Sequence, residues 1–252
     1  MLKLVHYASG ESFTVKKASQ VLSYFTLFEK CLWLVSVVTV AVCYILSPNG
    51  DVFSLIASLI GVTALIFIAK GNVIGQVLIV IFAVFYGIIS YSFSYYGEMI
   101  TYLGMSAPIA VISVITWLKH PYKKNVSNTE AKQSSEVAIN SVSARTWAIV
   151  GILTAGVTVA FYFILVALET ENPVLSTVSV TTSFAAASLS ALRSPYYALG
   201  YALNDIVLIT LWILATVEDI SYLPMIICFT VFLVNDSYGF ICWQKRKRNQ
   251  NA

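Results

Sequence analysis

The chain has 252 residues, of which 58% are hydrophobic and 11% charged, and its formal net charge is +3. Soluble domains carry about 25% charged residues, so a water-soluble domain of this length would leave too much apolar surface in contact with water. The mean hydropathy of +0.81 therefore predicts an all-α integral membrane protein, for which the bilayer acts as the solvent.

Eight segments are apolar and long enough to cross a bilayer, which takes about 20 residues. They are Lys30–Leu46, Val52–Ala69, Ile74–Tyr95, Ile100–Leu118, Trp147–Leu168, Val174–Leu192, Tyr197–Thr216 and Tyr222–Trp243. Most connections between them are short. Residues 119–146 form the long connection, whose Ser, Asn and Lys content predicts a flexible loop.

The distribution of charged residues predicts how the spans are oriented in the membrane. All fifteen Lys and Arg fall in the N-terminal segment, at the first residue of the first span (Lys30), in alternate connections or in the C-terminal tail. In the intervening connections, all of the charged residues are acidic. Because Lys and Arg collect on the cytoplasmic side of a membrane, this distribution predicts eight spans with both termini in the cytoplasm. The N-terminal segment 1–29 is then cytoplasmic or interfacial, and residues 244–252 are a basic cytoplasmic tail.

Two stretches share a pattern of three helices. Residues 52–118 end near Trp117, residues 174–243 end near Trp243, and glycines Gly75 and Gly200 lie early in the two middle helices. A single span, residues 147–168, separates the stretches, so both enter the membrane from the same side. The sequence predicts two parallel three-helix repeats joined by a linker helix, preceded by one extra helix over residues 30–46. Parallel repeats are a transporter architecture, with the solute site between the halves.

Only two acidic residues lie within the spans, Asp205 and Asp236, and each follows an asparagine. Ionisable groups inside a membrane are costly and usually functional. One interpretation is that these groups join neighbouring helices. The alternative, which we favour, is a solute site of amides and carboxylates with aromatic rings that stack on a planar ring. The predicted substrate-binding residues are Gln76, Tyr86, Asn204, Asp205, Trp212, Asn235, Asp236 and Tyr238.

Enzymatic functions find no support in the sequence. There is no phosphate-binding G-x-x-x-x-G-K-[ST] motif, no G-x-S-x-G motif and no mid-span lysine for a retinal Schiff base. An intramembrane aspartyl enzyme needs two facing carboxylates, but the usual signatures around such acids are absent. Both histidines lie outside the spans and no C-x-x-C pair exists, so we expect no metal and no cofactor. The basic tail predicts contact with lipid headgroups rather than nucleic acid.

Several short motifs occur together along the chain. They are Lys70-Gly71-Asn72, Tyr95-Tyr96-Gly97-Glu98-Met99 with Pro108 and Trp117, Leu192-Arg193-Ser194-Pro195, and Asn235-Asp236-Ser237-Tyr238-Gly239-Phe240 followed by Trp243. In their order and spacing these motifs resemble the PnuC family of vitamin transporters, and the resemblance covers about residues 50–244.

This resemblance implies a fold similar to the SWEET sugar carriers and a location in the bacterial inner membrane. It implies uptake of nicotinamide riboside, a precursor of NAD, by facilitated diffusion with trapping by a cytoplasmic kinase, and a homotrimeric assembly. Two alternatives stay open. One is a proton-coupled or uncoupled carrier of another vitamin such as thiamine, and the other is a membrane subunit that transports nothing.

Overall fold

The structure is a computed structural model that describes residues 24–46, 52–92, 96–123, 133–170, 172–218, 220 and 223–251. The chain forms two compact units that divide inside a helix, after Val35. Eight helices among the described residues are long and apolar enough to cross a membrane. The predicted all-α membrane fold is thereby confirmed.

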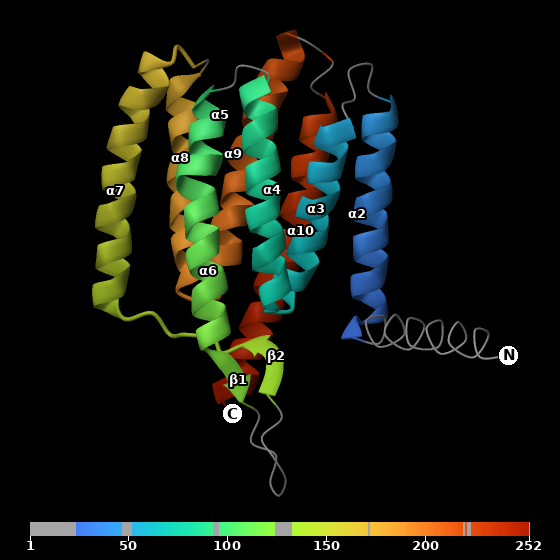
Figure 1. The fold of residues 1–252 in the computed structure, drawn as a ribbon, viewed down its shortest axis with the longest axis vertical. Coiled ribbons are helices and arrows are strands. Elements are labelled where there is room, and N and C mark those ends of the chain that lie inside the picture. The colour runs from blue at the N-terminus through green and yellow to red at the C-terminus, as the bar shows by residue number, and fades with distance from the viewer. Residues whose placement is uncertain are drawn as a thin grey trace, which may run out of the picture. The chain divides into compact units, whose positions relative to one another are not determined.

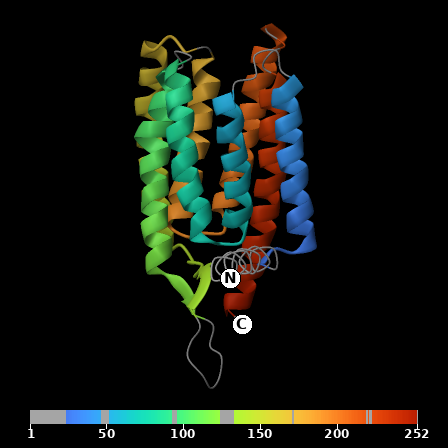
Figure 2. The same cartoon turned by 45° about the vertical axis from the view of Figure 1, so that its right-hand side comes forward.

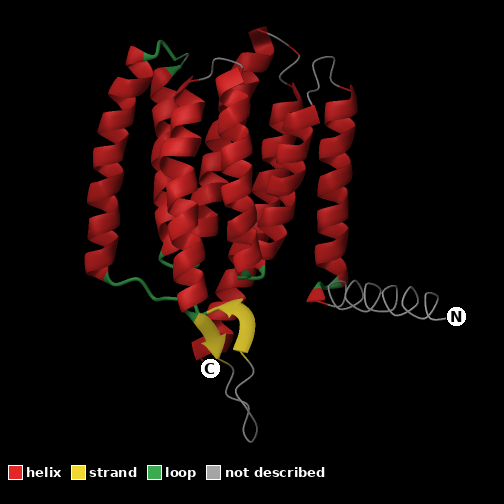
Figure 3. Cartoon of the chain, viewed as in Figure 1, coloured by secondary structure: helices red, strands yellow, loops and turns green. Residues whose placement is uncertain are grey.

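Helices account for nearly all of the described chain, and one short strand pair lies at the end of the bundle that holds the C-terminus (Figures 1 and 3). The elements are α2 Leu27–Leu46, α3 Val52–Ala69, α4 Val73–Ser92, α5 Tyr96–Ile100, the π-helix η1 Thr101–Ser106, α6 Ala107–Lys119, β1 Pro121–Lys123, β2 Gln133–Val137, α7 Ala144–Ala167, α8 Pro173–Ala191, α9 Tyr197–Glu218 and α10 Leu223–Asn251.

Helix α2 begins three residues before the predicted span because its first turn carries a reciprocal cap. The backbone N–H of Thr26 donates to Glu29 Oε2 at 2.7 Å, and the N–H of Glu29 donates to Thr26 Oγ1 at 3.3 Å. Such a capping box satisfies two of the amide donors that a helix start leaves open.

The predicted span Ile100–Leu118 is divided into α5, η1 and α6. At the junction, the N–H of Ala107 donates to the carbonyl of Tyr102, five residues earlier. Pro108 follows in the first turn of α6 and has no N–H to continue the regular ladder. The π-helix changes which side chains before the proline face the bundle.

Six helices of the second unit pack in a closed ring, in the order α3, α4, α6, α8, α9, α10 and back to α3. Helix α7 packs outside this ring against α8 (Figures 1 and 2). The third helix of each repeat contacts the first helix of the other, as α6 does with α8 and α10 with α3. The helices that come third and first therefore form the boundary between the two repeats.

The turns after α3 and α8 have the same backbone conformation. Gly71 and Arg193 both adopt left-handed φ values, +65° and +58°. The N–H of Gly71 donates to the carbonyl of Ile68, and that of Arg193 donates to Ser190. The next donors match as well, since Asn72 bonds Phe67 and Ser194 bonds Leu189. These are the paired bonds of a Schellman helix end.

This match corrects one detail of the predicted repeat. Counted from the turns, Gly75 corresponds to Tyr197 rather than to Gly200. Both glycines still lie where helices approach closely: a Cβ on Gly75 would lie 2.7 Å from the backbone nitrogen of Ile68, and one on Gly200 would lie 2.9 Å from Ala186 Cβ.

Two buried tryptophans join the repeats reciprocally. Trp117 Nε1 donates to the carbonyl of Ser190 at 2.9 Å, and Trp243 Nε1 donates to the carbonyl of Ile68 at 2.8 Å. Their ring centroids are 5.3 Å apart. Because Ile68 and Ser190 are equivalent turn positions, these contacts relate the repeats by an approximate two-fold axis along the helices. The tryptophans fill the centre of the ring at the end that carries these turns.

Replacing either tryptophan with phenylalanine is expected to lower the stability of the folded protein by about 1–2 kcal/mol, because each loses one buried hydrogen bond. The measurement is thermal unfolding in detergent. Trp147→Phe is the control, since Trp147 is 41% exposed and should show little change. A fall in melting temperature for only one of Trp117→Phe and Trp243→Phe would contradict the equivalence of the repeats.

The long connection was predicted to be a flexible loop, but its described part is built into the bundle end. We call residues 136–140 the end strap. The N–H of Val137 donates to the carbonyl of Gly71, and that of Asn140 donates to the carbonyl of Arg193. Glu136 lies 3.3 Å from Arg246 Nε on α10. The end strap therefore contacts the equivalent turns of both repeats.

Candidate functional site

The predicted site residues are distributed over several places in the second unit rather than gathered in one. Only Asn204 lines a hollow between the repeats. This hollow, which we call the inter-repeat hollow, has a volume of about 60 Å³. It lies between α5 and η1 of the first repeat and α8 and α9 of the second, and Leu165 near the end of the linker helix α7 also lines it. Its polar lining consists of Thr101, Tyr102, Thr170, Ser176, Ser179, Ser183 and Asn204.

The amide of Asn204 is held in one orientation by two hydroxyl groups of α8. Ser179 Oγ donates to Asn204 Oδ1 at 3.1 Å, and Thr182 Oγ1 donates to the same oxygen at 2.8 Å. The side-chain oxygen is thereby occupied. The amide nitrogen has no acceptor among the described residues, so its two N–H groups are left to bind a solute in the hollow.

Aromatic rings stand behind the polar lining. Tyr102 lines the inter-repeat hollow, and its ring centroid lies 4.3 Å from that of Tyr86 and 5.9 Å from that of Phe82. The predicted Tyr86 is therefore one layer behind a tyrosine that the sequence interpretation missed. The missed signal is the π-helix, because Tyr102 lies within η1, and π-helical turns frequently occur at functional sites.

Gln76 links the two repeats instead of lining the hollow. Its side chain is 3% exposed, and its Nε2 donates to Ser190 Oγ at 2.9 Å. Ser190 is also the residue whose carbonyl accepts from Trp117. Gln76 thus belongs to the end of the ring that holds the two tryptophans, where its side chain reaches from α4 to α8.

Asn235 faces the extra helix. Its Nδ2 donates to Ser36 Oγ of α2 at 3.0 Å and to the carbonyl of Val231 at 2.8 Å. Val40 of α2, Val62 of α3 and Cys228 of α10 form a buried apolar cluster in the same region. The two asparagines that looked alike in the sequence therefore have different surroundings, one at the hollow and one between packed helices.

Asp205 and Asp236 are brought together. They are 3% and 5% exposed, and their carboxyl groups approach each other within hydrogen-bonding reach across the contact between α9 and α10. Neither lines the inter-repeat hollow, and neither do the partly buried Trp212 and Tyr238. Of the eight predicted residues, the structure thus assigns Asn204 to the hollow and Tyr86 to its second layer.

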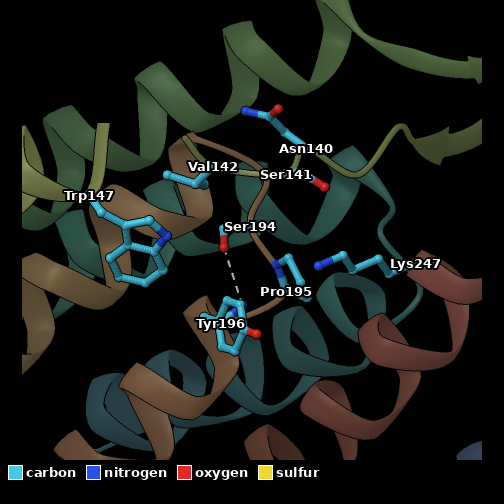
Figure 4. Close-up of a pocket in the computed structure, with 8 residues that line it drawn as sticks. All are labelled: Asn140, Ser141, Val142, Trp147, Ser194, Pro195, Tyr196 and Lys247. Carbon is cyan, nitrogen blue, oxygen red and sulfur yellow. Dashed lines mark hydrogen bonds between the residues drawn. The ribbon is translucent and has the colours of Figure 1, made fainter. Parts of the chain in front are cut away.

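A second hollow of about 240 Å³ lies at the bundle end that holds the end strap (Figure 4). It is lined by Asn140, Ser141, Val142, Trp147, Ser194, Pro195, Tyr196 and Lys247. Lys247 Nζ is 6.0 Å from the centroid of the Tyr196 ring. No predicted site residue lines it. Its walls come from the linker helix, the turn after α8 and the basic tail, so it is not a path between the repeats.

Two parallel three-helix repeats that enclose a polar hollow within eight apolar helices define a multi-pass membrane transporter. Residues 51–245 match the family described as "Nicotinamide mononucleotide transporter", and the chain belongs to this family.

Individual relatives agree with this assignment. The chain is 28% identical over 223 residues to a nicotinamide riboside transporter PnuC of Neisseria mucosa, covering 87% of this chain and 82% of the relative. It is 24% identical over 209 residues to the nicotinamide riboside transporter PnuC of Haemophilus influenzae, covering 82% and 85%. A solved structure described as the crystal structure of the vitamin B3 transporter PnuC matches with a TM-score of 0.71 and 26% identity, covering 88% of this chain and 92% of that one.

Proposed function

We propose that this protein carries nicotinamide riboside across the membrane by facilitated diffusion, and that a cytoplasmic kinase traps the solute by phosphorylation. The names of both relatives support the choice of solute. The observation that carries the proposal is the inter-repeat hollow, whose lining of hydroxyl and amide groups suits a neutral sugar.

Nicotinamide riboside joins a ribose to a planar cationic ring. The hydroxyls of Ser176, Ser179 and Ser183 are suited to the ribose, and the N–H groups of Asn204 are suited to its oxygens. A cationic ring is attracted to aromatic faces, and Tyr102, supported by Tyr86, offers one beside the hollow. In this proposal the remaining predicted residues, Gln76, Asp205, Trp212, Asn235, Asp236 and Tyr238, act by holding the helices around the solute.

The inter-repeat hollow must widen to admit this solute. Ligand pockets typically measure about 300–1,000 Å³, whereas the hollow has about 60 Å³. The tryptophan pair and the end strap fill the opposite end of the ring. The structure thus corresponds to a contracted state, and rocking of one repeat against the other would open the hollow.

Nicotinamide mononucleotide, although named in the family description, is expected to be refused. None of the residues that line the inter-repeat hollow is Lys or Arg, so a phosphate dianion would lose its water without gaining a cation. The test is uptake of each radiolabelled compound into proteoliposomes. Nicotinamide riboside should equilibrate and the mononucleotide should stay outside.

The same assay tests the transport mechanism. Uncoupled diffusion predicts that nicotinamide riboside reaches equal concentrations on the two sides, whatever the pH gradient. Accumulation above equality when a pH gradient is imposed would reject facilitated diffusion in favour of proton coupling. Equal uptake of the mononucleotide would reject the proposed selectivity, and a lack of saturable uptake of any vitamin would favour a non-transporting subunit.

We further propose that both termini face the cytoplasm of a bacterial inner membrane, and that the protein is a homotrimer as the resemblance implies. The basic residues Lys70, Arg193 and Lys247 belong to the bundle end that holds the end strap, as the positive-inside rule requires of a cytoplasmic end. Lys70 precedes Gly71, which the end strap binds, and the carbonyl of Arg193 accepts from the N–H of Asn140. Lys247 lines the same hollow as Asn140. A reporter enzyme active only in the cytoplasm should be active when fused to the C-terminus. Activity of a C-terminal fusion to a reporter that works only in the periplasm would contradict the proposed orientation.

A further inference from the structure

The pair formed by Asp205 and Asp236 has no part in the proposed solute site. Asp205 lies on α9 and Asp236 on α10, both are buried, and their carboxyl groups are within hydrogen-bonding reach of each other. The second oxygen of Asp205, Oδ2, is buried and has no hydrogen-bond partner among the described residues. The pair is thus a buried, incompletely satisfied acidic site.

A hydrogen bond between two carboxyl groups requires a proton, because an ionised carboxylate only accepts. Two carboxylates in contact do not both ionise, since their charges repel. Burial adds to this, because two adjacent negative charges in a membrane interior lack the solvation that water provides.

The described parts of the neighbouring helices supply no positive charge that would replace the proton. Along their described lengths, α3 and α8 carry no charged residue, and neither does α2 from Ser36 onward. The titratable groups that interact with the pair are Tyr197 and Tyr201 on α9 and Cys228 on α10. Cys43 of α2 interacts with Cys228. Arg246, near the end of α10, acts on Tyr197.

The first repeat shows that the helix contact itself does not need these acids. Counted from the matching turns, Asp205 corresponds to Ala83 of α4. Counted back from the matching tryptophans, Asp236 corresponds to Ala110 of α6. Both alanines are buried, at 1% and 4% exposure, and α4 packs against α6 as α9 packs against α10. The carboxyl pair therefore lies at positions where the first repeat has two buried alanines.

We propose that Asp205 and Asp236 form a binding site for a single proton, which joins α9 to α10 and leaves the pair with one negative charge instead of two. The proton stays bound at neutral pH. Its loss at alkaline pH places two carboxylates in contact and loosens α9 from α10. This proposal does not depend on which solute is carried.

The test combines infrared spectroscopy of the full-length protein with its thermal unfolding from pH 6 to pH 9.5. At neutral pH the wild type should show the C=O stretch of a protonated carboxylic acid, and this band should be lost in both Asp205→Asn and Asp236→Asn. In either variant the amide N–H donates to the remaining carboxylate and replaces the proton. Glu218→Gln is the control, since Glu218 is exposed and should leave the band unchanged.

The melting temperature of the wild type should fall as the pH rises, whereas the two asparagine variants should show a much smaller fall. The infrared band reports the carboxylic acid itself, so it separates the titration of the pair from that of Tyr197, Tyr201 and Cys228, which interact with it. The absence of an acid band in the wild type would overturn the proposal, even if neither variant folds. Equal pH dependence in wild type and variants would also overturn it, as would a melting temperature that follows sodium concentration instead of pH.

Discussion

Asn204→Ala is expected to weaken the binding of nicotinamide riboside at least about tenfold, which corresponds to about 1.4 kcal/mol. Asn204 is the predicted amide that lines the inter-repeat hollow, and two hydroxyls of α8 hold its oxygen so that its N–H groups remain for the solute. The substitution removes both donors and also the oxygen that Ser179 and Thr182 bind. Calorimetric titration of the purified protein with nicotinamide riboside measures the change.

Asn235→Ala is the matched control, because it makes the same substitution before the second aspartate. Asn235 bonds Ser36 of α2, so its loss should lower the melting temperature and leave the affinity unchanged. If the affinity for nicotinamide riboside is unchanged in both variants, the inter-repeat hollow is not the binding site. An affinity lost only in Asn235→Ala would place the solute between α10 and α2.

Gly75→Ala is expected to destabilise the protein by about 3 kcal/mol, the upper part of the range for overpacking a closely packed core. A Cβ at this position would lie 2.7 Å from the backbone nitrogen of Ile68 and 2.8 Å from the carbonyl oxygen of Ala64. Backbone atoms do not move aside as the end of a flexible side chain does, so α3 and α4 would have to separate. Thermal unfolding in detergent measures the effect.

Gly151→Ala provides the control for this change, since no atom lies within 4 Å of the added Cβ. In the middle of a helix, alanine is favoured over glycine by about 0.5–1 kcal/mol, so Gly151→Ala should slightly raise the melting temperature. If Gly75→Ala is as stable as Gly151→Ala, the close approach of α3 and α4 does not exist in the folded protein.

The overall fold was accessible from sequence because hydropathy and charge act over whole segments. The predicted span Val52–Ala69 coincides with α3, and the other spans differ from the helices mainly at their ends. Those ends depend on local hydrogen bonds, such as the capping box of Thr26 and Glu29. The division of the fourth span at η1 depends on how the chain accommodates Pro108, which hydropathy does not show.

The candidate site was less accessible because it depends on which face each side chain presents. Asn204 and Asn235 have the same neighbour in sequence, yet one lines the inter-repeat hollow and the other bonds α2. The difference arises from the packing of the extra helix against α10, which no local pattern encodes. Tyr102 was missed for a similar reason, since its position follows from the π-helix.

The end strap shows how polar composition can mislead. Residues 136–140 lie in a segment whose composition predicts a flexible loop. Backbone N–H and C=O groups form hydrogen bonds whatever the side chain is, so this composition does not exclude an ordered segment. The donors of Val137 and Asn140 find carbonyls at the left-handed residues Gly71 and Arg193, where each helix has just ended. The positions of these free carbonyls are set by the tertiary structure.

The reciprocal bonds of Trp117 and Trp243 have a consequence for the way the ring opens at this end. Each indole belongs to one repeat and its acceptor to the other, so a motion that separates the repeats at both boundaries breaks the two bonds together. We therefore expect this end to open cooperatively, in a single transition without a half-open intermediate. A fluorescence signal from the two indoles should then change in one phase during transport.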